Sequence, residues 1–203
     1  MTDWLAALEP GAPDVVAAFR ALGEERFLDV RREVRRRAGA GTAEGVVDQL
    51  AVVADALSSV VGDLPEVAFA LPGGEGDWTV AEAVGHDISA RAGLVMAASL
   101  AASGRWPADA PVVVPGVPGA ADADRAALLG RIATSQRIVA RAARSLVGHE
   151  LDPCPLDHPL VGHLRCGEWL LFAGVHDLMH LGQLHRIAAG RPVSATGLSR
   201  GRD

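Results

Sequence analysis

The sequence predicts an all-α protein: a four-helix bundle with long connections and an N-terminal helical extension. Three observations support this fold class. Apolar residues recur every three to four positions in several long segments, as on one face of a helix. Prolines and glycines gather between these segments, and no segment alternates apolar and polar residues as a half-buried strand would. We expect the extension over residues 1–41, an antiparallel bundle over 42–191 and a frayed tail over 192–203.

The extension contains the first helical pattern. It covers residues 13–37, and its apolar stripe consists of Val16, Phe19, Leu22, Phe27, Val30 and Val34. Such a stripe should pack against the bundle or against a partner subunit. Its C-terminal end carries a cluster of arginines, Arg31, Arg32, Arg35, Arg36 and Arg37. Positive charge suits a helix C-terminus, so we interpret the cluster as a solvated face, with an anion site as the alternative.

Four longer patterns predict the helices of the bundle. They cover residues 42–61, 79–102, about 122–147 and 168–191. The second begins at Thr79, which has capping-box spacing to Glu82, and Asp122 or Asp124 caps the third. The connections over 65–77, 104–121 and 148–166 contain turn residues, and the second of them has four prolines. We therefore expect loops there and no sheet.

Composition narrows the class of protein. The net charge of −6 argues against nucleic acid as a partner, and the absence of lysine excludes Schiff-base chemistry. No apolar run reaches the length of a membrane span, and the N-terminus lacks the basic region of a secretory signal. These features predict a cytoplasmic protein that does not bind membranes. Cys154 and Cys166 fit no metal-binding pattern, so we interpret them as reduced structural thiols.

Histidines interrupt the apolar stripe of the last helix. His176 and His180 are four residues apart, which places their Cβ atoms roughly 5–6 Å apart on one face. His86 lies on the second bundle helix among small residues that leave room beside it. A histidine on an apolar face is more often a hydrogen-bonded core residue, but adjacent desolvated imidazoles are costly unless something bridges them. The three histidines therefore predict a site for one divalent ion, zinc, nickel or iron, with an open coordination position.

Other polar residues near this pair have simpler interpretations. The segment HDLMH resembles the HExxH protease motif, but Asp177 is one methylene shorter than the glutamate of that motif. We expect Asp177 to hydrogen-bond a neighbouring group or a histidine instead. His185 falls on the opposite side of the helix from His176, so it is not a candidate ligand. The histidines of the predicted 148–166 loop should have surface roles; they are His149, His158 and His163.

Two sequence segments together resemble a known family. WTVAEAVGH at 78–86 and HDLMHLGQL at 176–184 are similar to segments of the DinB/YfiT-like superfamily, and the resemblance covers about residues 42–191. It implies a four-helix bundle with a tri-histidine metal site, whose ligands here would be His86, His176 and His180. Members include thiol-dependent transferases and the metal domain of mycothiol-dependent maleylpyruvate isomerase. The N-terminal extension and the 104–121 connection depart from the family, so the substrate is not implied.

The resulting functional hypothesis is a divalent-metal-dependent enzyme acting on a small molecule. The resemblance favours a transferase or isomerase that uses a low-molecular-weight thiol. We also expect a homodimer. Two alternatives remain open at this point: a hydrolase that uses metal-activated water, and a non-enzymatic ligand-sensing or stress-response module.

Overall fold

The computed structural model describes residues 4–22, 27–38, 42–74, 76–159 and 161–190. Four long helices of this described part form the bundle: α4 (Ala43–Asp63), α5 (Val80–Ala102), α6 (Arg125–Ala143) and α7 (Cys166–Ala188). The all-α bundle predicted from the sequence is confirmed. The predicted tail over 192–203 lies outside the described residues, and the boundaries of the domains stay a prediction.

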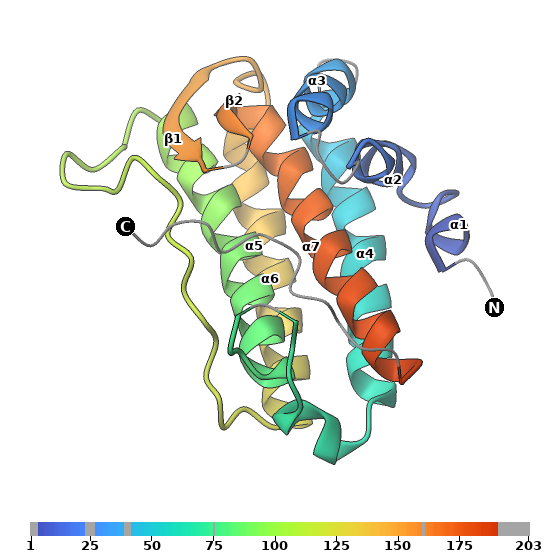
Figure 1. Cartoon of the computed structure of the whole chain (residues 1–203). Coiled ribbons are helices and arrows are strands. Elements are labelled where there is room, and N and C mark those ends of the chain that lie inside the picture. Colours follow the sequence, from blue (N-terminus) through green and yellow to red (C-terminus); the bar gives the residue numbers. More distant parts are fainter. Residues whose placement is uncertain (1–3, 23–26, 39–41, 75, 160, 191–203) are drawn as a thin grey trace.

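The direction of the helices differs from a simple antiparallel arrangement. After α5 the chain runs back along the length of the bundle before α6 begins, so α5 and α6 point the same way (Figure 1). Side-chain contacts follow the same direction, because Ser89 meets Arg131 of α6 and Ser99, further along α5, meets Ser145 just after the end of α6. The long 104–121 connection therefore spans the bundle from one end to the other, which a short hairpin loop could not do.

The helix ends follow the capping chemistry of the sequence. Thr79 accepts a hydrogen bond from the Glu82 amide at 3.2 Å, and the Glu82 carboxylate accepts one from the Thr79 amide at 2.8 Å, so the predicted capping box is present. Asp124 caps α6 by accepting from the Ala127 amide at 2.8 Å. A short 3-10 helix, η1 (Glu66–Ala70), precedes α5, and another, η2 (Arg144–Leu146), follows α6.

By length and composition, α4 is apolar enough to cross a membrane. This is weak support for a membrane span, because a core helix of a globular bundle has the same composition. The face of α4 that carries Val46, Leu50, Val53 and Leu57 is buried against the other helices. Its apolar character is accounted for by this packing.

The extension packs onto the bundle. The pattern predicted over 13–37 forms two helices, α2 (Pro13–Arg20) and α3 (Phe27–Ala38), preceded by α1 (Trp4–Leu8). Val15 and Val16 of α2 and Val30 and Val34 of α3 are fully buried in the same core as the bundle. α2 and α3 are separate helices that both lie against α7 of the bundle (Figure 1).

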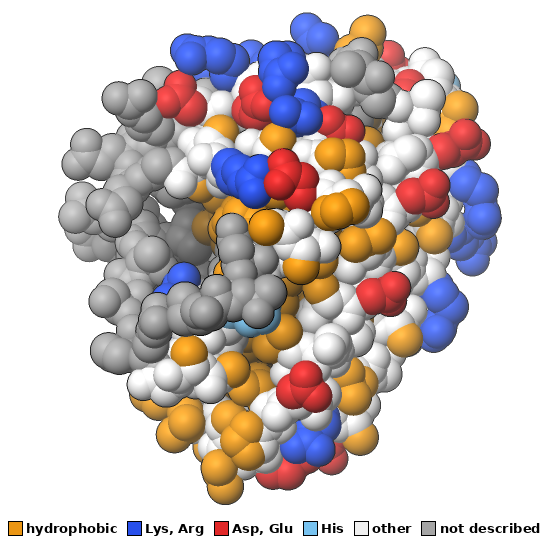
Figure 2. Space-filling model, turned by 90° about the vertical axis from the view of Figure 1, so that its right-hand side faces the viewer, with side chains coloured by type: hydrophobic (Ala, Val, Ile, Leu, Met, Phe, Trp, Pro, Cys, Tyr) orange, Lys and Arg blue, Asp and Glu red, His pale blue; other side chains and the backbone are white. Residues whose placement is uncertain are grey.

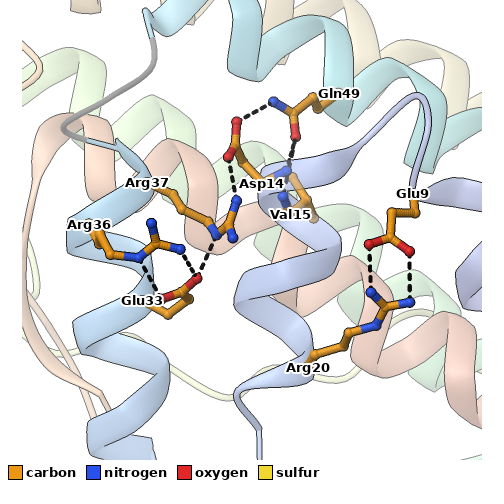
Figure 3. A network of polar contacts seen from close by, with 8 residues as sticks. All are labelled: Glu9, Asp14, Val15, Arg20, Glu33, Arg36, Arg37 and Gln49. Carbon is orange, nitrogen blue, oxygen red and sulfur yellow. Dashed lines mark hydrogen bonds and ion pairs between the residues drawn. The ribbon is translucent and has the colours of Figure 1, made fainter.

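Polar contacts join the extension to α4 (Figure 3). The Gln49 side-chain oxygen accepts hydrogen bonds from the amides of Asp14 at 2.8 Å and Val15 at 3.2 Å. Its amide group donates to the Asp14 carboxylate at 2.9 Å, and the same carboxylate pairs with Arg37 at 2.8 Å. Gln49 thus caps the start of α2 from the neighbouring helix.

The arginine cluster is largely paired with carboxylates of the protein itself. Arg36 and Arg37 both contact Glu33 at 2.6 Å, and their hydrogen bonds lower the Glu33 pKa to about 2. Arg35 lies 3.5 Å from the buried Glu168. On the face drawn in Figure 2, arginine and acidic side chains are interspersed, and positive charge does not gather in one patch. These pairings favour the surface interpretation over an anion site.

The connection before α7 was predicted wrongly. Residues 148–166 contain a hairpin of β1 (Pro153–His158) and β2 (Gly162–Arg165), paired antiparallel. Burial alternates along β1, with Cys154 and Leu156 inside and the intervening prolines exposed, so the prolines concealed a short strand by occupying its solvent face. The prediction for the cysteines agrees with the structure, since Cys154 and Cys166 are buried free thiols.

Candidate metal centre

Two neighbouring helices of the bundle, α5 and α7, bring three histidines together. His86 comes from α5, and His176 and His180 come from successive turns of α7. The ring centroids of His86 lie 5.3 Å from His176 and 5.4 Å from His180, and those of His176 and His180 are 4.7 Å apart. The candidate ligand nitrogens of the three residues lie within 4.8 Å of one another. The set predicted from the sequence is therefore assembled in space.

Each of the three rings is held at its Nδ1 atom. His86 Nδ1 lies 2.7 Å from the Val117 carbonyl oxygen, His176 Nδ1 lies 3.1 Å from Asp87 Oδ1, and His180 Nδ1 lies 2.8 Å from Gln183 Oε1. A carbonyl or carboxylate oxygen can only accept, so these partners select the tautomer that carries its proton on Nδ1. The Nε2 lone pair of each ring is thereby left for a ligand, as in metal-binding histidines generally.

The protonation of His180 also suits a metal ligand. Burial lowers the pKa of His180 to about 3, and the neighbouring His176 and His86 act in the same direction. The ring is therefore neutral at ordinary pH, as ligation requires. Its Nε2 is buried and has no hydrogen-bond partner among the described residues. A buried nitrogen of this kind is costly unless a ligand satisfies it, so the residues present fit a metal ion.

A buried charged set lies behind the histidines. The Arg91 guanidinium is 2.9 Å from the Asp177 carboxylate, with both side chains 1% exposed, and it also donates to the Leu50 carbonyl at 2.8 Å and to Gln136. Burial raises the pKa of Asp177 well above its ordinary value, and Asp87 adds to this effect while Arg91 opposes it. The Arg91 guanidinium supplies the positive charge beside this buried carboxyl group.

Asp87 is the carboxylate that acts on a histidine. Burial alone would raise its pKa, but the facing imidazoles of His180 and His176, together with the hydrogen bond from His176, lower it below the ordinary value. Asp87, His176 and Asp177 also lie within 4.8 Å of one another. The cluster of Asp87, His176 and Asp177 already has a cation beside it, because the Arg91 guanidinium contacts Asp177.

The other predicted residues fall in distinct places. Asp177 pairs with Arg91, which agrees with the neighbouring-group alternative of its prediction. The carboxylate that contacts a histidine is Asp87. His185 stacks on Trp4 of α1 with ring centroids 4.9 Å apart, away from the three histidines. His149 and His163 are exposed beside Asp152 and Asp157.

His158 does not have the surface role expected for it. It is partly buried, its ring lies 4.9 Å from that of Phe172, and burial followed by the nearby His176 lowers its pKa to about 4.

A comparison with protein families gives a match over most of the bundle. The family model described as the DinB superfamily matches residues 49–184, which include all three histidines. The chain belongs to the DinB superfamily. This confirms the resemblance carried by the two sequence segments. Searches of curated proteins and of solved structures gave no match to this DinB protein.

Sequence reasoning missed three groups that support the histidines: Asp87, Arg91 and the Val117 carbonyl. Asp87 and Arg91 are four residues apart on a helix that is otherwise largely apolar or small, and this spacing marks charges on a buried face. That signal was available in the sequence. No sequence pattern indicates a main-chain carbonyl thirty-one residues from its histidine, because its position depends on the path of the connection.

Proposed function

We propose that this DinB protein is a divalent-metal-dependent enzyme whose ion is held by His86, His176 and His180. One observation carries the proposal. All three rings have Nδ1 engaged by an acceptor, so each ring presents its Nε2 to a ligand, and the rings of His176 and His180 are buried. Three neutral imidazoles leave one coordination position open, which is the arrangement of catalytic zinc sites. Nickel and iron accept the same donors.

The surrounding residues supply what such a site requires. Asp87 orients the ring of His176 through its hydrogen bond, and Gln183 and Val117 orient the other two rings. A bound divalent ion supplies Lewis acidity, which polarises a substrate oxygen and lowers the pKa of a water or thiol that it binds. The protein has no lysine and no tyrosine, so its own acid–base groups are those of histidine, aspartate, glutamate and cysteine.

The proposed substrate is a small molecule, and the resemblance to thiol-dependent members favours a low-molecular-weight thiol as cosubstrate. The reaction would then be a transfer or isomerisation in the cytoplasm. Within the same site, a metal-activated water would give a hydrolase, and a site without turnover would give a ligand-sensing module. The nature of the nucleophile separates these functions.

The ligand set is tested by measuring the metal content of purified protein by elemental analysis. Wild-type protein should hold one ion per chain after exposure to zinc or nickel. His86→Ala, His176→Ala and His180→Ala should each lose it, while His185→Ala retains it because His185 stacks on Trp4. Equal metal in all five proteins, or none in any of them, would overturn the proposal.

The reaction class is tested on metal-loaded protein with a panel of electrophilic substrates, each with and without a low-molecular-weight thiol. Turnover that requires the thiol and disappears in His180→Ala supports the transferase or isomerase. Turnover without thiol makes the protein a hydrolase. No turnover on any substrate by protein of full metal content removes the enzyme proposal and favours the sensing module.

A further inference from the structure

The connection between α5 and α6 is seated against α5 by contact between two glycines. A Cβ atom placed on Gly119 would lie 2.5 Å from the Gly85 Cα and 2.8 Å from the Glu82 carbonyl oxygen. A Cβ atom placed on Gly85 would lie 2.8 Å from the Gly119 Cα. Side chains do not fit at such distances, so only glycine at both positions allows this approach. The Gly119 amide donates to the Glu82 carbonyl at 2.9 Å and completes the contact.

The other end of the same segment is attached to the hairpin. The Val112 carbonyl accepts from the Asp157 amide at 2.7 Å, and the Val114 amide donates to the Asp157 carbonyl at 2.9 Å. We call residues 112–120 the strap, because this segment is fastened to β1 at one end and to α5 at the other. Between the fastenings lies Val117, whose carbonyl holds His86.

The strap is stiff around Val117. Pro118 follows Val117 directly, and Pro115 lies two residues before it. Each proline fixes its own φ, and Pro118 restricts Val117 to an extended conformation. The direction of the Val117 carbonyl therefore follows from where Gly119 is seated. A displacement of the glycine contact would move this oxygen away from His86 Nδ1, which it now meets at 2.7 Å.

His86 differs from the other two histidines in this respect. His176 and His180 donate their Nδ1 hydrogen bonds to buried side chains of α5 and α7, which belong to the packed core. His86 donates its hydrogen bond to the Val117 carbonyl, in a segment where the Val117 side chain is 57% exposed. The position of one proposed metal ligand thus depends on the docking of a surface segment.

We propose that strap docking and metal binding are coupled through His86, with Gly85, Gly119 and Val117 as positioning residues. The inference rests on the proposed function and adds regulation of the same site: an undocked strap weakens metal binding, and a bound ion tightens the strap. The coupling is reciprocal by thermodynamic necessity, so one factor describes both effects. Loss of a hydrogen bond to a ligating histidine typically lowers metal affinity about tenfold to a hundredfold, and we expect a coupling factor in this range.

The first arm of the test measures zinc affinity by competition with a chromophoric chelator. Gly119→Ala displaces the strap from its own side, and Gly85→Ala does so from the helix side, where alanine is the better helix former. Both should bind zinc about tenfold to a hundredfold more weakly than wild type. Gly116→Ala is the matched control in the same strap, because a Cβ atom there has nothing within 4 Å; its affinity should equal that of wild type.

The second arm needs no variant. Exchange of the Gly119 amide, measured by NMR or hydrogen exchange, should slow on saturation with zinc by the same factor, since its bond to Glu82 reports docking. The Ala110 amide donates to Pro107 within the connection and should exchange at an unchanged rate.

The outcomes of the two arms separate this inference from the proposed function. Wild-type protein that binds no metal overturns the proposed function and the coupling together. Wild-type protein that binds zinc, with normal affinity in both alanine variants or with unaltered Gly119 exchange, overturns the coupling alone.

Discussion

Replacement of Asp87 by asparagine should weaken metal binding without unfolding the protein. In the structure Asp87 Oδ1 lies 3.1 Å from His176 Nδ1, and the side chain is fully buried. Ligation draws electron density from the imidazole ring, so the Nδ1 proton becomes a better donor and its bond to a carboxylate strengthens. Asparagine keeps an oxygen acceptor of the same shape but loses the negative charge.

The magnitude follows from the type of hydrogen bond. Bonds to charged groups contribute about 1.5–3 kcal/mol and neutral ones about 0.5–1.5 kcal/mol. The exchange therefore costs about 1–1.5 kcal/mol, or close to a tenfold increase in the zinc dissociation constant. Asp87→Leu removes the acceptor altogether and leaves Nδ1–H unpaired, so we expect a loss of about a hundredfold, the upper end for such partners.

The assay is a zinc titration at pH 7, paired with thermal melts of the metal-free proteins to separate binding from folding. Asp152→Asn is the matched control, because Asp152 makes the same carboxylate–imidazole contact with the exposed His149 at 2.7 Å. It should bind zinc as wild type does. An Asp87→Asn protein whose zinc affinity stays within about twofold of wild type, or an equal loss in Asp152→Asn, would refute the role assigned to Asp87.

Three further predictions concern stability. Arg91→Met leaves buried carboxyl groups without their cation and should lower the unfolding free energy, measured by denaturant titration, by about 3–5 kcal/mol. The double variant Arg91→Met/Asp177→Asn should recover much of this loss. An equal loss in the single and the double variant would contradict the pairing of Arg91 with Asp177. Gly174→Ala places a Cβ 2.6 Å from Leu50 and 2.8 Å from Val15, so overpacking should cost about 1–3 kcal/mol, whereas Gly130→Ala, with nothing within 4 Å, should not destabilise. The pKa of Glu33 is lowered from 4.5 to about 2, so this residue contributes stability that is present above pH 4.5 and is lost as the pH falls towards 2. Glu33→Gln should therefore be less stable than wild type at pH 7. A stability difference that persists at pH 2 would contradict the role assigned to Glu33.

The helices could be predicted because their signals are local. The capping box at Thr79 and the cap at Asp124 both appear in the structure, since a cap depends on residues only three positions apart. The histidine pair could be predicted for a related reason, because His176 and His180 share a face by helical spacing alone. Their meeting with His86 required the pairing of α5 with α7, which the family resemblance implied.

The features that were missed depend on contacts distant in sequence. The hairpin at 153–165 carries alternating burial, but prolines on its exposed positions concealed the pattern. The parallel direction of α5 and α6 follows from the path of the 104–121 connection, and no property of either helix encodes it. The role of Val117 arises from the same path. Main-chain carbonyls have no sequence signature, so the supporting group of His86 was the least predictable part of the site.

The polar residues between α5 and α7 are difficult to explain by stability. Arg91 and Asp177 are nearly fully buried, and apolar residues of similar volume in place of a buried ion pair are often neutral or stabilising, by about 1–4 kcal/mol. His180 adds a buried nitrogen without a partner among the described residues, which is a further cost. A bundle selected only for packing would fill this space with leucine and valine, as α4 does on its buried face. A divalent ion would give the buried His180 nitrogen a partner and would offset the desolvation of the three rings. Binding of such an ion would therefore account for histidines that packing alone does not explain.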